Sequence, residues 1–304
     1  MGYIFNCTKN YIKCASGILL LILMLSACTN EQNVPDVDFE NKDSIRLLIR
    51  GDDMGINHAT NQAIIDSYTD GIQKSAEVIV PGPWFLEAAA LLQEHPGLDA
   101  GVHLTLSSEW SYLKWSPLTN SKSLVDDNGY FYPMIWSNEH YGADQALREQ
   151  NWKISEIEQE FRKQIEKARK HIPQISHLSY HMGCNDMDPS VHDLVENLAQ
   201  EYGLDINLNK AGVQRLHLQG PHDSVKSLTN RFLEKVSKLE PGDYYYIGHP
   251  AYDTSEMQAV FLKGNTDVAR NRQMITELYT SSEVQNSLEK WNVKLIDYTD
   301  LIEN

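Results

Sequence analysis

The chain is predicted to be an α/β protein, a distorted (β/α) barrel of the TIM type forming a single catalytic domain. Apolar runs of strand length alternate with segments of helical periodicity, which is the pattern of a parallel sheet. About eight such strands in roughly 250 residues is the content of a (β/α) barrel. Ionisable residues also recur near the ends of several predicted strands, where barrel enzymes carry their catalytic groups.

The predicted elements follow in order from these patterns. Strands are expected at 46–50, 76–80, 100–106, 175–180, 204–208, 213–218, 244–247 and 293–298. Helices are expected at 58–69, 84–94, 154–171, 190–201, 223–238 and 267–279. In the third helix, Ile157, Phe161 and Ile165 recur at helical spacing, which predicts one apolar face.

The first 27 residues have the layout of a secretory signal, with lysines, then an apolar run at 18–25, then small residues. The run is too short for a comfortable membrane span. The ending at 25–28 resembles the bacterial lipoprotein signal, which predicts lipidation of Cys28 and a lipid-anchored protein of the cell envelope, periplasmic or surface-facing. An ordinary signal peptide or an uncleaved anchor is the alternative.

Residues 28–43 are polar and acidic, and we interpret them as a flexible tether to the domain at 44–304. Two lysines and no acidic residues lie in 1–27, so removing the signal takes the net charge from −16 to −18. Nucleic acid is an unsuitable partner for such an acidic chain, and the membrane is expected to be contacted through the lipid alone. Besides Cys28, only Cys184 would then remain, so no intrachain disulfide is expected.

A long segment at 107–150 interrupts the alternation and is rich in aromatic residues, which argues against disorder. Aromatic rings stack on sugar faces, so Trp110 and Trp115 are candidate substrate-binding residues. A packing flap or a subunit contact is the alternative, and the segment is therefore also compatible with a homo-oligomer.

Two adjacent carboxylates, Asp52 and Asp53, follow the first predicted strand. Such neighbours repel each other unless a cation or a shared proton relieves them. In a metal site, one carboxylate can bind the ion while the other acts as a base. The alternative is a strand-to-helix turn in which aspartate serves as turn former or helix cap.

Three histidines, His103, His181 and His249, lie near the ends of three other predicted strands. A single histidine is more often structural, but the ends of parallel barrel strands share one face, so these placements favour a common site. An aspartate with two histidines suits a divalent ion. Zinc, magnesium, manganese and cobalt are all compatible, with magnesium or zinc preferred. Cys184 is a weak candidate nucleophile, since only His181 is near enough to activate it.

These residues resemble the YdjC-like carbohydrate deacetylases, which include the chito-oligosaccharide deacetylases. The likeness rests on residues 50–57, 77–83, 95–106, 177–181 and 248–250, in the expected order along nearly the whole mature chain. It implies a distorted barrel that removes an N-acetyl group from an amino sugar or its oligosaccharides.

By that likeness, Asp53, His103 and His181 would hold a divalent ion. Asp52 would deprotonate the attacking water, and His249 would protonate the leaving amine. The chemistry is coherent, because an ion polarises the amide carbonyl and activates water, while a histidine is suited to protonating an amine.

Three positions depart from the family pattern. Ser179 replaces an aspartate and Gly183 replaces the last histidine of the fourth motif, and serine would orient a ligating histidine more weakly. Arg50 is also unusual and could bind a substrate carboxylate, pair with an active-site aspartate or lie on the surface. Besides the deacetylase, a related hydrolase of another amide or ester and a catalytically lapsed sugar-binding lipoprotein stay open.

Overall fold

The computed structural model describes residues 44–219 and 223–302. The predicted signal peptide, the lipidation site Cys28 and the predicted tether all lie outside these residues. Within them, no helix combines the length and apolar character needed to cross a membrane.

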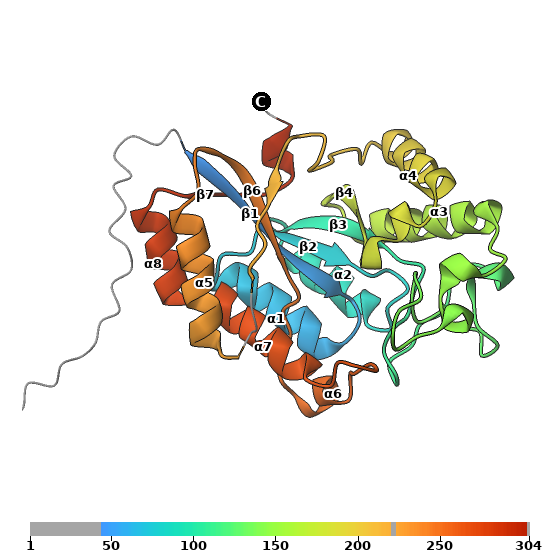
Figure 1. The fold of residues 1–304 in the computed structure, drawn as a ribbon. Helices are drawn as coiled ribbons and strands as arrows, with labels where there is room; N and C mark the ends of the chain where they lie inside the picture. Colours follow the sequence, from blue (N-terminus) through green and yellow to red (C-terminus); the bar gives the residue numbers. More distant parts are fainter. Residues whose placement is uncertain (1–43, 220–222, 303–304) are drawn as a thin grey trace, which may run out of the picture. The chain divides into compact units, whose positions relative to one another are not determined.

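In this described part of the chain, seven parallel strands form one curled, open sheet (Figure 1). The strands are β1 (Ile45–Met54), β2 (Ser75–Val78), β3 (Asp99–Leu104), β4 (Ile175–Tyr180), β5 (Gln214–Arg215), β6 (Gly242–Gly248) and β7 (Lys294–Ile296). Their order is β4-β3-β2-β1-β6-β5, and β7 pairs with the first half of β1. The end strands β4 and β5 do not pair with each other, so the sheet is a half-barrel, and the predicted distorted α/β barrel is confirmed.

Helices follow the strand order around the sheet (Figure 1). They are α1 (His58–Thr69), α2 (Phe85–Glu94), α3 (Ile154–His171), α4 (Pro189–Tyr202), α5 (Val225–Ser237), α6 (Ser255–Gln258), α7 (Val268–Tyr279) and α8 (Ser282–Lys290). Contacts link α4 to α3, α3 to α2, α2 to α1 and α1 to α7. Helix α1 begins at His58, shortly after the carboxylate pair, because the Asn57 side chain caps it by accepting a hydrogen bond from the amide of Thr60 at 2.8 Å.

One predicted strand, 204–208, is wrong. Leu204 and Leu208 are buried as expected for strand residues, but the chain turns at Asn207, whose side-chain oxygen accepts the amides of Asn209 and Lys210 at 3.0 and 3.1 Å. Such a side-chain-capped turn competes with strand pairing. The segment lies in the gap between β4 and β6, where residues of all three line a small cavity.

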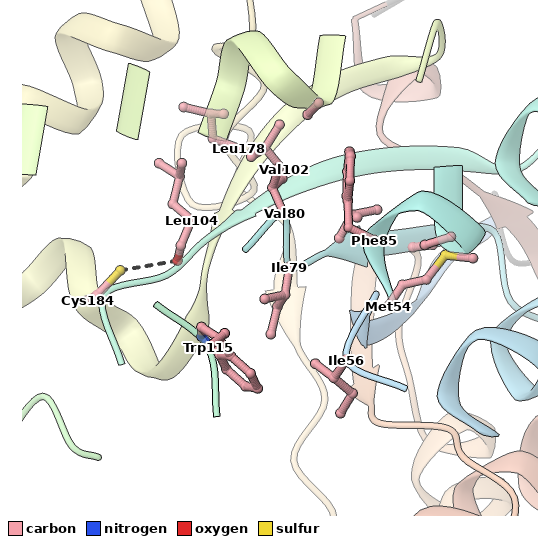
Figure 2. Packing of buried hydrophobic residues seen from close by; sticks show 14 of the residues in the cluster. Met54, Ile56, Ile79, Val80, Phe85, Val102, Leu104, Trp115, Leu178 and Cys184 are labelled. Carbon is pink, nitrogen blue, oxygen red and sulfur yellow. Dashed lines mark hydrogen bonds between the residues drawn. The ribbon is translucent and has the colours of Figure 1, made fainter. Parts of the chain in front are cut away.

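The main core packs between the sheet and the helices α1 to α4 (Figure 2). Cys184 lies inside it and donates a hydrogen bond to the carbonyl of Leu104 at 3.3 Å. Burial raises the pKa of this thiol well above its ordinary value, so Cys184 is unsuited to act as a nucleophile.

The long aromatic segment packs onto helix α3. The carboxylate of Glu160 accepts the amides of Leu118 and Thr119 at 3.0 Å each. Trp115 is 3% exposed and lies in the core (Figure 2), where its indole N–H donates to the carbonyl of Ser107 at 2.9 Å. The segment therefore supplies core side chains as well as the wall of the site.

Candidate active site

The sheet brings the predicted site residues to one cavity at the carboxyl ends of its strands. Asp52 and Asp53 are near the end of β1, and His103 is the fifth residue of β3. His181 directly follows β4, and His249 directly follows β6. All five line a cavity of about 690 Å³.

Asp53, His103 and His181 form a buried cluster, each offering one ligand atom within 4.8 Å of the others. Asp53 Oδ1 lies 3.2 Å from His181 Nδ1 and 3.8 Å from His103 Nε2. This oxygen is buried and makes no hydrogen bond to any residue that the structure describes. A buried carboxylate oxygen without a partner needs a compensating group, and with two imidazoles beside it the donor set fits a divalent ion.

An irregularity in β1 turns both carboxylates toward the cavity. Successive side chains of a regular strand point to opposite faces of the sheet. Asp53, however, has a φ of 73°, and the pairing of β1 with β2 shifts register between Gly51 and Met54. Left-handed backbone is unfavourable for most side chains but is tolerated by aspartate. The strain is located where two neighbouring carboxylates face the same site.

Each carboxylate has its own buried arginine. Arg50 donates to the two oxygens of Asp52 through Nε at 2.7 Å and Nη2 at 2.8 Å. Arg272, from α7, donates to Asp53 Oδ2 at 2.5 Å. Burial alone would raise the pKa of Asp53, but the charges of Arg272 and His181 outweigh it and hold this pKa well below its ordinary value. Asp53 is therefore an ionised ligand before any ion binds.

Polar partners also hold the two histidines. His181 Nε2 lies 3.0 Å from a carboxylate oxygen of Glu109, and His103 Nδ1 lies 2.8 Å from Ser179 Oγ. Although burial lowers the pKa of His181, Glu109 and Asp53 raise it to about 10. Burial and the neighbouring charge of His181 together lower the pKa of His103 well below its ordinary value.

The remaining predicted residues divide into two groups. His249 is exposed at the cavity wall. Trp110 also lines the cavity, and the guanidinium of Arg272 lies 5.1 Å from the centre of its ring. Both tryptophans belong to the core, but Trp115 does not line the cavity, and its ring packs against that of His181 with the centroids 6.1 Å apart. The structure therefore does not support Trp115 as a substrate-binding residue.

Arg50 also differs from the prediction of a substrate-binding residue. It lines the cavity, but its guanidinium is engaged by Asp52 and donates to the hydroxyl of Tyr298 at 3.0 Å. The geometry corresponds to the second alternative considered for this residue, pairing with an active-site aspartate.

Three residues of the site were not predicted from the sequence. Arg272 reaches Asp53 across 219 residues, and nothing in its local sequence indicates that contact. Glu109 follows the third predicted strand closely, so it could have been predicted as a site residue by the same reasoning that identified Asp52 and Asp53. Glu77 lies within one of the stretches that carry the family resemblance, and it contacts Ser179.

Comparisons with known proteins agree with this geometry. The family model described as YdjC-like protein matches residues 46–290. A protein of Listeria innocua named carbohydrate deacetylase 1 is 26% identical over 266 residues, covering 84% of this chain and 100% of its own. A carbohydrate deacetylase of Thermus thermophilus is 30% identical over 238 residues, covering 70% and 80%. A chitooligosaccharide deacetylase of Serratia marcescens is 29% identical over 182 residues, covering 58% and 64%.

The fold also has a solved counterpart. A crystal structure of a candidate cellobiose-phosphate cleavage protein from Enterococcus faecalis aligns with a TM-score of 0.66 at 22% identity. The alignment covers 85% of this chain and 99% of that one. At this identity the likeness concerns the fold alone.

Proposed function

The chain belongs to the YdjC-like protein family, and on that premise we propose that it is a metal-dependent hydrolase removing N-acetyl groups from amino sugars or their oligosaccharides. The observation that carries the proposal is the buried cluster of Asp53, His103 and His181, with a second carboxylate, Asp52, at its edge. Relatives named carbohydrate deacetylase along most of the chain support the same chemistry.

Asp53, His103 and His181 would hold the ion, for which magnesium and zinc are the candidates. When bound, a divalent ion polarises an amide carbonyl and lowers the pKa of water at the site. Both imidazoles have a polar partner on the nitrogen that faces away from Asp53, as is usual for ligating histidines. The donor set does not discriminate between the two ions.

Asp52 would act as the base that takes a proton from the attacking water. Its Oδ2 lies 3.7 Å from His103 Nε2, so the carboxylate borders the cluster without belonging to it. The two hydrogen bonds from Arg50 fix its orientation, which is required for efficient proton transfer.

His249 would act as the acid. Water adds to the carbonyl carbon, the carbon–nitrogen bond breaks, and the amine nitrogen must gain a proton to leave. His249 is exposed on the cavity wall, where an incoming sugar can reach it. The products are acetate and the free amino sugar, and Trp110 supplies an aromatic wall for the sugar.

The decisive experiment is acetate release from N-acetylglucosamine oligomers by residues 44–304. Samples would contain magnesium, zinc, manganese or cobalt, or a chelator. Acetate that depends on the ion and disappears with the chelator supports the deacetylase. A bound ion without acetate would redirect the assignment to another amide or ester. Absence of both acetate and a bound ion would favour a sugar-binding protein.

We also propose that Cys28 carries a lipid and that residues 28–43 tether the domain to a membrane of the cell envelope. The proposal rests on the lipoprotein-like ending of the signal. The full-length protein, expressed in a lipoprotein-processing bacterium, should incorporate a labelled fatty acid, and the Cys28→Ser variant should not. Absence of label in the unmodified protein, or equal labelling of the variant, would contradict a lipid on Cys28.

A further inference from the structure

We propose that Glu77 is a positioning residue that acts through the hydroxyl of Ser179 to hold His103 in the tautomer required of a metal ligand. The inference rests on the proposed role of His103 in binding the ion. It also gives a function to the serine that stands where an aspartate is expected by family resemblance.

The three residues form a continuous chain of hydrogen bonds across three strands. Glu77 is in β2, His103 in β3 and Ser179 in β4. Ser179 Oγ donates to Glu77 Oε2 and lies 2.8 Å from His103 Nδ1. All three side chains are buried, Glu77 completely, so water does not compete for these hydrogen bonds.

The direction of each hydrogen bond follows from counting protons. A serine hydroxyl carries one proton, and an ionised carboxylate can only accept. Because Ser179 gives its proton to Glu77, its oxygen must accept from His103. The proton of His103 therefore lies on Nδ1, and the lone pair of Nε2 faces Asp53 Oδ1, 3.8 Å away. A metal ligand requires that lone pair.

Glu77 is itself held in one orientation. Its other oxygen, Oε1, lies 2.8 Å from His177 Nε2 and 3.7 Å from Arg50 Nε. A β-carbon at Gly101 would lie only 2.4 Å from Glu77 Oε2 and 2.3 Å from His177 Nε2, so a residue without a side chain is needed there. The sheet thus has space for this carboxylate directly behind Ser179.

In the family pattern, the carboxylate that orients the ligating histidine belongs to the residue at position 179 itself. Here the carboxylate comes from Glu77 in β2, on the other side of β3 from Ser179, and one hydroxyl separates it from His103. On this view, Ser179 relays the hydrogen bond between the Glu77 carboxylate and His103 and is not a weakened substitute for an aspartate. Moving the carboxylate from position 77 to position 179 should therefore preserve the effect on His103.

The first measurement compares the ion affinity of the unmodified protein with that of four variants, by titration calorimetry with zinc and with magnesium. Glu77→Gln and Ser179→Ala should each lower the affinity by about 10- to 100-fold, the usual effect of losing the partner of a ligating histidine. Ser179→Asp alone should also weaken binding, because it places two carboxylates in contact. The Glu77→Gln, Ser179→Asp double variant should regain most of the lost affinity, because it returns one carboxylate to His103.

The second measurement reads the tautomer directly in metal-free protein. Nitrogen chemical shifts of the His103 ring, assigned by their loss in His103→Gln, should report a proton on Nδ1 in the unmodified protein. In Ser179→Ala and Glu77→Gln the proton should redistribute toward Nε2. This readout does not require an ion or any turnover.

A matched control separates positioning from general loss of stability. Glu160 is also a completely buried carboxylate, but it holds the amides of Leu118 and Thr119 and makes no hydrogen bond to His103 or Ser179. Glu160→Gln should lower thermal stability and leave both ion affinity and the His103 shifts unchanged.

The outcomes distinguish this inference from the proposed function. If the unmodified protein binds no ion, the metal assignment fails, and the ring shifts still decide whether Glu77 sets the tautomer. If the unmodified protein binds an ion, unchanged affinity and unchanged shifts in Glu77→Gln and Ser179→Ala would overturn the inference. Failure of the double variant to recover affinity would also count against it.

Discussion

Replacing Asp52 with asparagine tests the separation of base and ligand in the neighbouring carboxylates. The variant keeps the shape of the side chain and removes its charge. Asp52 does not belong to the three-residue cluster, so the ion should bind with unchanged stoichiometry. Loss of a general base typically slows the reaction by about 10²- to 10⁴-fold. We expect the rate of acetate release to decrease by a factor in this range.

The structure also predicts a loss of stability in this variant. Arg50 is buried and would lose the charge to which it donates two hydrogen bonds. Removing one partner of a buried ion pair costs about 3–5 kcal/mol. We expect the lower end, about 3 kcal/mol, because asparagine keeps one acceptor oxygen and Glu77 lies 3.7 Å from Arg50 Nε. For a domain of this size this corresponds to a decrease in Tm of about 6–12 °C.

Acetate release, ion content and thermal unfolding should be measured on the same preparation, at a temperature well below the transition of the variant. The base assignment is refuted if Asp52→Asn, fully loaded with ion, retains activity close to that of the unmodified protein. A variant that loses both its ion and its activity would instead show that Asp52 contributes to binding the ion.

Three further predictions follow from the same geometry. Asp53→Asn should lower ion affinity by at least about 100-fold, since it removes the charged ligand, and calorimetry showing normal binding would contradict the assignment. His249→Gln should bind the ion normally but release acetate about 10²- to 10⁴-fold more slowly. A substrate with a better leaving group needs less help from an acid, so the variant should be slowed less on that substrate than on the amino sugar. Equal slowing on the two substrates would argue against an acid role. The third concerns acid stability. Burial would raise the pKa of Glu77, but the charges of His177 and Arg50 outweigh it and lower this pKa below 4.5. The carboxylate therefore stabilises the fold above that pH, and its contribution is lost as the pH falls through the lowered pKa. Urea unfolding should show a stability difference between unmodified protein and Glu77→Gln that shrinks on acidification, and a constant difference would contradict this.

The elements whose signals are local were predictable from the sequence. Helices α1 and α3 and strand β4 begin and end at the predicted residues. Helix α1 has a capping residue at its start, and α3 has an uninterrupted apolar period. Strand 204–208 was wrongly predicted because Leu204, Ile206 and Leu208 alternate in the sequence as in a strand, while the hydrogen bonds of Asn207 form a turn.

The candidate site was predictable only in part, for a similar reason. Asp52, Asp53 and the three histidines lie near the carboxyl ends of predicted strands, and parallel topology alone brings such positions together. The arginines and glutamates that hold them depend on contacts between distant segments. Arg50 is the exception, because Arg50 and Asp52 lie two residues apart in β1 and their side chains therefore share one face of the sheet; this pairing was one of the alternatives that the sequence left open. Arg272 comes from a helix near the end of the chain, and only the folded structure shows its partner.

The two arginines have a consequence for how the protein would handle its ion. Arg50 and Arg272 already compensate the charges of Asp52 and Asp53 in the folded chain, so the site is assembled without a cation. In many small metalloproteins the ion supplies the folding energy and its removal unfolds the chain. Here we expect the ion to be exchangeable. Chelation should abolish activity without unfolding the protein, and the metal that occupies the site would reflect the ions available around the protein as much as the selectivity of the site.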